Sequence, residues 1–390
     1  MKALDQASGP PVFLDYAAGG PPRDVVLGGH SRRARHLFYN PHATSSQSEQ
    51  CRREIQVAER RLLDCLGIDP AEASVVWASG GTEALNLAIL GCLREARGAY
   101  CCVESSGHPA IRMPAREFER NGGEVGWLPV TEAGQLILPE PAPPEAGQRR
   151  DPGVVAVCHV NNETGSVQDL VLLRRWLDRT RPGGYLVVDA LQSFTKLPIP
   201  WGTARIDLLA VGGRKIGGPP AVGALIVRRG TPLQPVLHGG GQQNGLRGGT
   251  LDTVGIVELV AAAEAGCGKR EQEWQRLQRL NRRLRTGIRA VGGPEMQILS
   301  ADDASPYILS VSFPGYEGAV LMRMLAEQHV VVATGSACSA ESSGVSHVLE
   351  AMGLSRKLGR GAMRISTGFG TTNRDVDRLL EVLPRVLQAY

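Results

Sequence analysis

Lys215 is the residue whose type and surroundings point most directly to covalent chemistry. It lies in a loop with glycines on both sides, at 211–218, between the apolar runs 206–211 and 221–227. A lysine at the end of a buried strand suits a Schiff base with a carbonyl compound, because an apolar floor lowers its pKa enough for proton loss near neutral pH. A surface lysine in a β-turn is the alternative that this loop alone leaves open.

An acid closes the preceding apolar run and changes the interpretation of that lysine. Asp189 follows Val187 and Val188, and the polar residue Gln192 comes three positions later. A strand that ends in aspartate, followed by a strand that ends near lysine, is the arrangement that pyridoxal 5'-phosphate (PLP) requires. The carboxylate keeps the pyridine nitrogen protonated, and the lysine holds the aldehyde. The pair therefore predicts PLP.

Polar residues follow several other predicted strands. The strand 74–78 leads through Ser79, Gly80, Gly81 and Thr82 into a helical pattern. A small-residue turn before a helix exposes unpaired amides that bind anions, although an ordinary capped turn has the same pattern. His108 follows a second strand, and the segment 159–165 follows a third. Open α/β sheets bind ligands at these carboxyl ends, so we expect one site there.

Cys338 differs from the other cysteines. The chain has eight, without a repeating spacing that would indicate a disulfide framework or a zinc site. Most lie in apolar runs, where cysteine behaves as a small buried hydrophobe. Cys338 instead lies in the small, polar segment 333–344. A thiol in such a loop is a candidate nucleophile.

The pattern of apolar segments predicts an α/β protein with two domains. Short apolar runs alternate with helical patterns through the middle of the chain, which is typical of a mainly parallel sheet covered by helices. Beyond residue 260 we expect a long amphipathic helix and a half-exposed strand at 308–313. We predict a large cofactor-binding domain at 16–260. The smaller α+β domain is predicted at 261–390, together with residues 1–15, and carries the Cys338 loop.

Composition excludes several classes of protein. The formal net charge of +4 is small, and a predicted basic helix also carries an apolar stripe, so we expect no direct nucleic-acid binding. The N-terminus has no signal-peptide core, and no apolar run approaches the ~20 residues that cross a bilayer. We expect a cytoplasmic protein with no membrane contact and no bound metal.

In order and spacing, the motifs together resemble the cysteine desulfurases, which belong to the class-V aminotransferases and the fold-type I PLP enzymes. The matching segments are 13–18, 40–41, 79–83, 159–165, 189–193, Lys215, 239–242, 247–250, 335–338 and Arg364. The distance from Cys338 to Gly353 resembles the long-loop, iron–sulfur-assembly-like branch. The resemblance implies a large domain with a mainly parallel seven-stranded sheet and a smaller C-terminal α+β domain.

The resemblance also implies how PLP is held. Lys215 would bind the aldehyde and move the substrate α-proton, and Asp189 would pair with the ring nitrogen. Other roles fall on residues around the ring and the phosphate. His108 would stack on the ring and act as an acid or base; Gln192 and Asn162 would lie near the phenolic oxygen; Gly81 and Thr82 would bind the phosphate; and Thr250 would reach the phosphate of a neighbouring subunit, which implies a homodimer.

For the substrate, the resemblance implies L-cysteine, with Arg364 clamping its carboxylate and Asn40 assisting. A guanidinium suits this bidentate role better than an ammonium. Cys338 would take the sulfur as a persulfide, leaving L-alanine, and pass it to a sulfur-acceptor protein, either a scaffold or a sulfur carrier. Three alternatives stay open: a selenocysteine lyase, a C–S β-lyase without a persulfide, and a non-enzymatic dimeric partner protein.

This chain departs from the family pattern at two places. Gly212 and Arg214 stand where the family usually has serine and histidine before the lysine. Loss of the serine hydroxyl removes a phosphate contact, for which the charge of Arg214 could compensate. The segment 42–47 also lacks the histidine that the family places near Ser46. Both departures indicate a divergent member, which we expect to serve a dedicated sulfur pathway.

Overall fold

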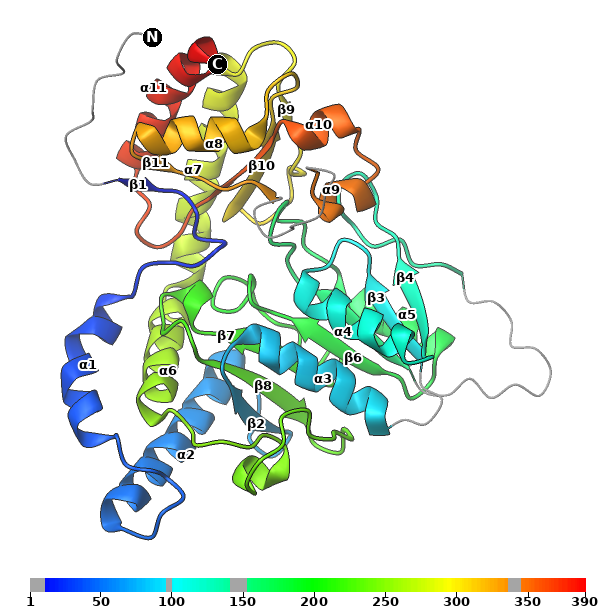
Figure 1. The fold of residues 1–390 in the computed structure, drawn as a ribbon, viewed down its shortest axis with the longest axis vertical. Helices are drawn as coiled ribbons and strands as arrows, with labels where there is room; N and C mark the ends of the chain where they lie inside the picture. The colour runs from blue at the N-terminus through cyan, green and yellow to red at the C-terminus, as the bar shows by residue number, and fades with distance from the viewer. Residues whose placement is uncertain (1–10, 96–99, 141–152, 336–344) are drawn as a thin grey trace.

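The computed structural model describes residues 11–95, 100–140, 153–335 and 345–390. Its main feature is a seven-stranded sheet in the order β2-β8-β7-β6-β5-β3-β4 (Figure 1). The strands are β2 (Ala73–Ala78), β3 (Tyr100–Glu104), β4 (Glu124–Leu128), β5 (Val154–Cys158), β6 (Tyr185–Asp189), β7 (Leu208–Gly212) and β8 (Gly223–Arg228). Both pairings of β8 are antiparallel and the other four are parallel. The predicted mainly parallel sheet is confirmed.

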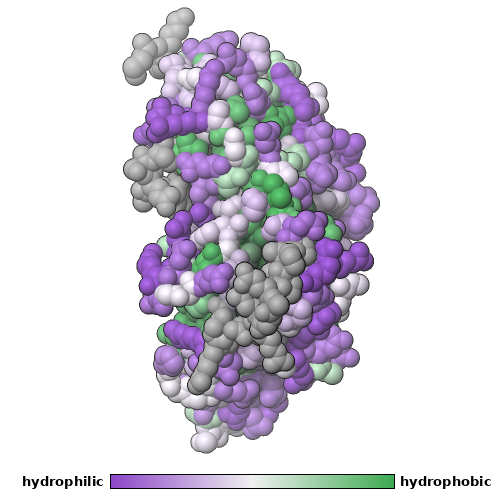
Figure 2. Space-filling view, turned by 90° about the vertical axis from the view of Figure 1, so that its right-hand side faces the viewer, coloured by the Kyte–Doolittle hydropathy of each residue, from purple (hydrophilic) through white to green (hydrophobic). Residues whose placement is uncertain are grey.

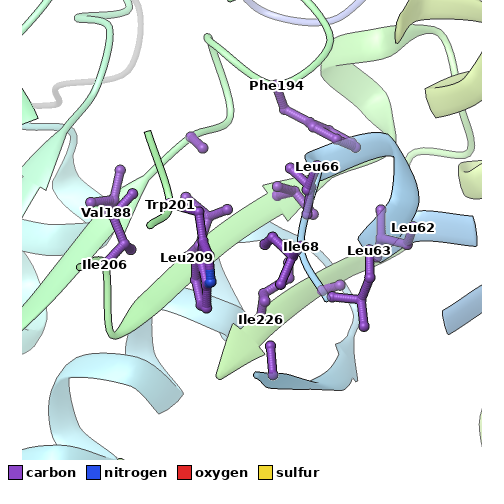
Figure 3. Close-up of a cluster of buried hydrophobic side chains, with 14 of the residues drawn as sticks. Leu62, Leu63, Leu66, Ile68, Val188, Phe194, Trp201, Ile206, Leu209 and Ile226 are labelled. Atoms are coloured by element: carbon purple, nitrogen blue, oxygen red, sulfur yellow. The ribbon is translucent and has the colours of Figure 1, made fainter. Parts of the chain in front are cut away.

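Helices cover both faces of this sheet, which explains why its central strands are apolar throughout. The covering helices are α2 (Ser46–Leu66), α3 (Gly81–Glu95), α4 (Pro109–Arg120), α5 (Leu170–Thr180) and α6 (Thr253–Cys267). One buried cluster joins α2, α5 and α6 to one face of the sheet, and a second joins α3 and α4 to the other. Figure 3 shows the first cluster, where leucines of α2 approach Leu209 of β7 and Ile226 of β8.

A second, smaller sheet lies at the other end of the molecule (Figure 1). It has the order β12-β10-β9, and a separate parallel pair joins β1 to β11. The strands are β1 (Val12–Phe13), β9 (Gln297–Ile298), β10 (Ile308–Ser312), β11 (Val330–Val331) and β12 (Ala362–Ser366). The surrounding helices are α7 (Arg270–Val291), α8 (Gly318–Glu327), α9 (His347–Ala351), α10 (Arg356–Arg360) and α11 (Asn373–Ala389).

The expectation of a half-exposed strand at 308–313 is wrong. Every residue of β10 is buried, because β10 is the middle strand of its sheet. Both serines that looked solvent-facing are buried, and the hydroxyl of Ser312 has a partner inside the protein: Ser312 Oγ donates to Leu358 O at 2.7 Å. Alternation of polar and apolar residues therefore did not indicate exposure here.

The connection between the two sheets passes through consecutive helices. Figure 1 shows α6 against the large sheet and α7 continuing into the smaller part. A separate buried cluster in that part combines Leu14 with side chains of α7, α8, α11, β10 and β12. The N-terminal strand β1 pairs there too, with β11. The domain boundaries at 16–260 and 261–390 stay a prediction.

The remaining regular elements lie at the surface or beside the site. They are α1 (Asp24–His36) and two short 3₁₀ helices, η1 (Arg214–Ile216) and η2 (Gln242–Gly245). The face shown in Figure 2 is mostly hydrophilic, with apolar side chains in small groups. Within the described ranges, no helix is both long and apolar enough to span a bilayer. The same residues contain no group of three or more potential metal ligands.

Candidate active site

A cavity of about 350 Å³ opens at the carboxyl ends of the central strands, where the sequence places polar side chains. Its walls come from β6, the loop after β7, the start of α3, the residue before α4, and β12 of the smaller sheet. Most of the predicted site residues line it together. They are Gly81, Thr82, His108, Asn162, Asp189, Gln192, Gly212, Arg214, Lys215 and Arg364.

Lys215 lies in η1, three residues after β7 ends. Its Nζ donates to the backbone oxygens of Ala17 at 2.6 Å and Ala18 at 2.9 Å. Burial lowers the pKa of Lys215 to about 8, and the positive charges of Arg364 and Arg214 act in the same direction. The neutral, nucleophilic form of Lys215 is therefore far more accessible near neutral pH than that of an ordinary lysine, as the sequence predicts.

Asp189 is the last residue of β6 and is buried in the floor of the cavity. Its Oδ1 accepts from Leu191 N at 2.9 Å. Burial raises the pKa of this carboxyl group, whereas His108 and Lys215 act to lower it. A carboxylate here is stabilised by a cation that enters the cavity, and a protonated ring nitrogen is such a cation.

His108 is the N-cap of α4, which fixes the orientation of its ring. Its Nδ1 accepts from Ala110 N at 3.1 Å, so in the neutral ring the proton is assigned to Nε2. Burial lowers the pKa of His108, while the negative charge of Asp189 acts to raise it. The ring lines the cavity. A neutral imidazole at this place offers a flat surface for stacking and one N–H donor.

The anion end of the cavity is the start of α3. Gly81 opens that helix, and a Cβ there would lie 2.2 Å from Leu191 Cδ2, so a larger residue would require the Leu191 side chain to move. The first amides of a helix have no intrahelical partner and attract anions. Arg214 adds a guanidinium to the same cavity and packs against Gly19. This end can hold a phosphate group.

Arg364 projects from β12 and has an acidic partner that the sequence did not reveal. Its Nη2 donates to Asp15 Oδ1 at 2.6 Å, and its Nη1 donates to Asn162 O at 3.0 Å. Arg364 Nε and Asn162 Oδ1 are buried without a hydrogen-bond partner among the described residues. Because buried polar atoms are normally paired, these two leave hydrogen-bonding capacity unused in residues that line the cavity.

Gln192 has two partners that orient its amide: Ala17, which lines the cavity, and Lys196, which does not. Its Nε2 donates to Ala17 O at 2.8 Å, and its Oε1 accepts from Lys196 Nζ at 3.2 Å. The same carbonyl oxygen of Ala17 accepts from Lys215. Sequence reasoning gave Ala17 and Lys196 no role. Lys196 lies one helical turn after Gln192, which is the only local signal that could have found it.

Two predicted residues lie outside the cavity of this chain. Asn40 is exposed, and its Oδ1 accepts from His42 N at 2.9 Å. Thr250 is also exposed and does not line the cavity. Its predicted role concerns a neighbouring subunit, so it stays a prediction, as does the role of Asn40.

Cys338 lies outside the described residues, but the two ends of the interval that contains it converge on one buried acid. A Cβ on Gly335 would lie 2.0 Å from Glu163 Oε2, and Ser346 hydrogen-bonds to the Glu163 carboxyl group. Glu163 follows Asn162 of the cavity wall. His347 Nε2 lies 2.9 Å from Gly107 O, next to His108. The interval therefore starts and ends beside the cavity.

The residues present fit PLP. The cavity is large enough for a small cofactor. It offers a lysine of lowered pKa for an aldehyde, a buried carboxylate for a ring nitrogen, and helix amides for a phosphate. Asn162 Oδ1 and Arg364 Nε, which have no hydrogen-bond partner among the described residues, add further hydrogen-bonding groups in the cavity wall.

Comparison with known proteins agrees with this site. Residues 12–379 match the aminotransferase class-V family. The cysteine desulfurase IscS of Escherichia coli O139:H28 is 35% identical over 383 residues, covering 96% of this chain and 92% of that protein. A solved NifS-like protein superposes with a TM-score of 0.88 at 27% identity, covering 97% of this chain and 100% of the other.

A third comparison involves a structure solved with an amino acid. SspA in complex with cysteine is 30% identical, with a TM-score of 0.77 and coverage of 91% of this chain and 98% of that one. These matches extend over almost the whole length of each protein. The resemblance that the motifs indicated is confirmed, and the chain belongs to the class-V aminotransferase family, among its cysteine desulfurases.

Proposed function

We propose that the protein is a PLP-dependent enzyme that converts L-cysteine to L-alanine and holds the sulfur as a persulfide on Cys338. The observation that carries this proposal is the convergence of Lys215, Asp189, His108 and Arg364 on one cavity. The family relationship supports the same activity, because IscS carries the name cysteine desulfurase. When bound, PLP supplies an electron sink that makes the α-hydrogen of the amino acid acidic.

Lys215 and Asp189 hold the cofactor from opposite sides. Lys215 would hold the cofactor through its aldehyde group, and the neutral form of its Nζ, favoured by the lowered pKa, would accept the α-proton of the substrate. Asp189 keeps the ring nitrogen protonated through its buried carboxylate. Gly81, Thr82 and Arg214 bind the phosphate at the start of α3.

Arg364 orients the substrate by its carboxylate. Its Nε has no hydrogen-bond partner among the described residues, and Asp15 holds the other end of the guanidinium in place. The buried position excludes water from the clamp, which strengthens a charge-assisted hydrogen bond. His108 faces the same cavity and can donate from Nε2.

Cys338 performs the sulfur transfer. Its thiolate attacks the substrate sulfur, a new S–S bond forms, and the C–S bond breaks with its electron pair on carbon. That carbon takes a proton, so L-cysteine and the enzyme thiol give L-alanine and the enzyme persulfide with no external oxidant. Glu163 and His347 support the proposal, since their contacts keep both ends of the 336–344 interval beside the cavity.

The proposed partners follow from the persulfide. A sulfur-acceptor protein, either a scaffold or a sulfur carrier, takes the outer sulfur from Cys338. We also propose a homodimer, in which Thr250 reaches the phosphate of the neighbouring subunit, and a cytoplasmic location. The exposure of Thr250, away from the cavity of its own chain, supports the shared site.

The test compares wild type with Cys338→Ala. We expect a yellow protein in both cases, with alanine formed from L-cysteine in the presence of a thiol reductant by the wild type. The variant should lose at least about a hundredfold in alanine formation, because the nucleophile is gone. Cys65→Ala is the control, since that cysteine lies outside the cavity.

Three outcomes would contradict the proposal. A colourless wild type that cannot be loaded with PLP would remove the cofactor. A yellow Cys338→Ala variant with wild-type turnover and free sulfide as product would identify a β-eliminating lyase instead. Turnover of selenocysteine but not of cysteine by the wild type would identify a selenocysteine lyase.

A further inference from the structure

Lys196 is a second buried lysine close to Lys215, and the mechanism above does not use it. Only 7% of its surface is exposed. The residue before it, Thr195, has φ 64°, a left-handed conformation that β-branched residues rarely adopt. Backbone strain of this kind costs about 1–3 kcal/mol and persists where the surrounding structure enforces it. Thr195, in this strained conformation, directs Lys196 into the protein interior. The burial of Lys196 therefore requires an explanation.

The ammonium of Lys196 is paired with an amide instead of an acid. Its Nζ donates to Gln192 Oε1 at 3.2 Å and lies 5.2 Å from the centre of the Tyr307 ring. Burying an ammonium without a carboxylate is costly, so an amide and an aromatic ring offset only part of the lost hydration. Burial accordingly lowers the pKa of Lys196 to about 7, so loss of the proton avoids part of this cost. Methionine or leucine would avoid all of it, which points to a use for the hydrogen bond that Lys196 donates to Gln192.

A continuous series of hydrogen bonds joins the two lysines. Lys196 holds the oxygen of the Gln192 amide, so the amide NH₂ group faces Ala17 O at 2.8 Å. The same carbonyl oxygen accepts from Lys215 Nζ at 2.6 Å. Gln192 Nε2 and Lys215 Nζ therefore share the Ala17 carbonyl oxygen as acceptor. The bond from Lys196 to Gln192 Oε1 holds the amide with its NH₂ group toward that oxygen.

A small cavity of about 20 Å³, the size of one water molecule, lies between the two lysines. Lys196 and Lys215 both line it. The other charged or titratable side chains of its wall are Tyr16, Arg23, Glu273 and Tyr307. The positive charges of Arg23 and Lys215 act to lower the pKa of Lys196. Glu273, the acid in this wall, is already paired with Arg276 at 2.8 Å. The groups that act on Lys215 from its other sides are Arg364, Arg214, Asp189 and Asp15.

We propose that Lys196 is a positioning residue for the cofactor lysine: it fixes the Gln192 amide so that this amide competes with Lys215 for the Ala17 carbonyl oxygen. The inference rests on the proposed function, because it gives Lys196 its importance through Lys215. The competition weakens the hydrogen bond that the charged form of Lys215 makes, and so favours the neutral, nucleophilic form.

The test measures the protonation of Lys215 in the full chain stripped of PLP. Trace acetylation with acetic anhydride across a pH series, followed by mass spectrometry, gives the pH midpoint at which Lys215 becomes reactive. The chain has few lysines, so each is resolved, and the exposed Lys269 and Lys357 serve as internal references. The wild-type midpoint should lie near pH 8, where burial places the pKa of Lys215.

Lys196→Met keeps the side-chain length and removes the charge. We expect it to raise the Lys215 midpoint by about half a pH unit or more, because the Gln192 amide is released and no longer competes for Ala17 O. Lys196→Arg should stay within about 0.2 pH unit of wild type, and the control Lys357→Met should not move the midpoint at all. In a Gln192→Leu background, Lys196→Met should add little, since the coupling passes through that amide.

An unchanged midpoint in a folded Lys196→Met protein would overturn the inference, as would an equal shift in the Gln192→Leu background. If Lys196→Met does not fold, Gln192→Leu carries the test alone: an upward shift supports the competition for Ala17 O, and no shift refutes it. Loading of the wild type with PLP, read from its visible absorption, tests the proposed function separately. A protein that never takes up PLP could still show the Lys215 shift, so the two failures are distinguishable.

Discussion

At the scale of single residues, Gly212 and Arg214 line the end of the cavity where we propose that the phosphate binds. A Cβ on Gly212 would lie 3.6 Å from Leu191 Cδ2 and 3.7 Å from Gly81 N, which are ordinary contacts. Nothing in the packing forbids the serine that the family usually has there. The hydroxyl is absent because the chain carries glycine, while Arg214 provides a charge in the same cavity. A neutral hydrogen bond has therefore been exchanged for a cation.

Arg214→Gln is expected to weaken PLP binding by about fivefold to tenfold. The guanidinium is exposed, so solvent limits its contribution to about 1 kcal/mol. The wild-type affinity should also fall with rising salt concentration, and that of the variant should respond less. Equilibrium dialysis of PLP at two salt concentrations measures both effects, with Arg53→Gln on the surface of α2 as the control.

Gly212→Ser in the Arg214→Gln background provides the reciprocal test. The serine hydroxyl would stand beside the first amides of α3 and should recover most of the lost affinity. Equal affinity for PLP in wild type and Arg214→Gln would show that this arginine has another task. In that case the helix amides alone hold the phosphate.

At the scale of elements, the site depends on how closely β8 and β7 approach the turn before α3. Gly212 and Gly223 are partners in the β7–β8 register, yet their surroundings differ. A Cβ on Gly223 would lie 2.7 Å from the backbone carbon of Gly80 and 2.8 Å from Val211 O. Backbone cannot move aside as a side chain can, so this glycine allows the turn to sit on the sheet.

Gly223→Ala should therefore destabilise the protein by about 1–3 kcal/mol through overpacking. Gly212→Ala is the matched control, because its added methyl group meets only ordinary contacts. Thermal unfolding followed by circular dichroism compares the two. A Tm of Gly223→Ala at or above that of Gly212→Ala would show that the turn before α3 adjusts without cost.

At the scale of the whole molecule, two residues that we predicted to contribute to the site lie outside the cavity of their own chain. Thr250 and Asn40 are both exposed, and neither lines the cavity. Large apolar side chains are also exposed before and after them, including Phe38 at 66% and Leu237 at 47%. Exposed apolar side chains near unused site residues are what a subunit interface would cover.

Sedimentation equilibrium should accordingly give twice the chain mass of 41.7 kDa. Phe38→Asp is expected to shift the protein toward the monomer, because a charge at a buried interface position is strongly unfavourable. Met113→Asp, at an exposed apolar residue of α4, is the comparison. A wild-type protein of single-chain mass at micromolar concentration would contradict the shared site.

Much of the site could be predicted from the sequence, because its key residues follow strands. Asp189 closes β6, Lys215 follows β7, and Thr82 lies in the first turn of α3 after β2, so local apolar runs already place each near the carboxyl end of a strand. Parallel strands bring those ends together by their topology. The family motifs then assigned PLP and the order of roles. These inferences needed only short segments and their spacing.

The tertiary structure alone decided the contacts between distant segments. Arg364 pairs with Asp15 across 349 positions, and Lys215 rests on the Ala17 carbonyl oxygen across 198. No local pattern specifies a backbone oxygen as an acceptor, since every residue has one. The same reason hid Lys196, whose burial depends on the fold around it, and misassigned β10, whose serines become buried only when the sheet is assembled.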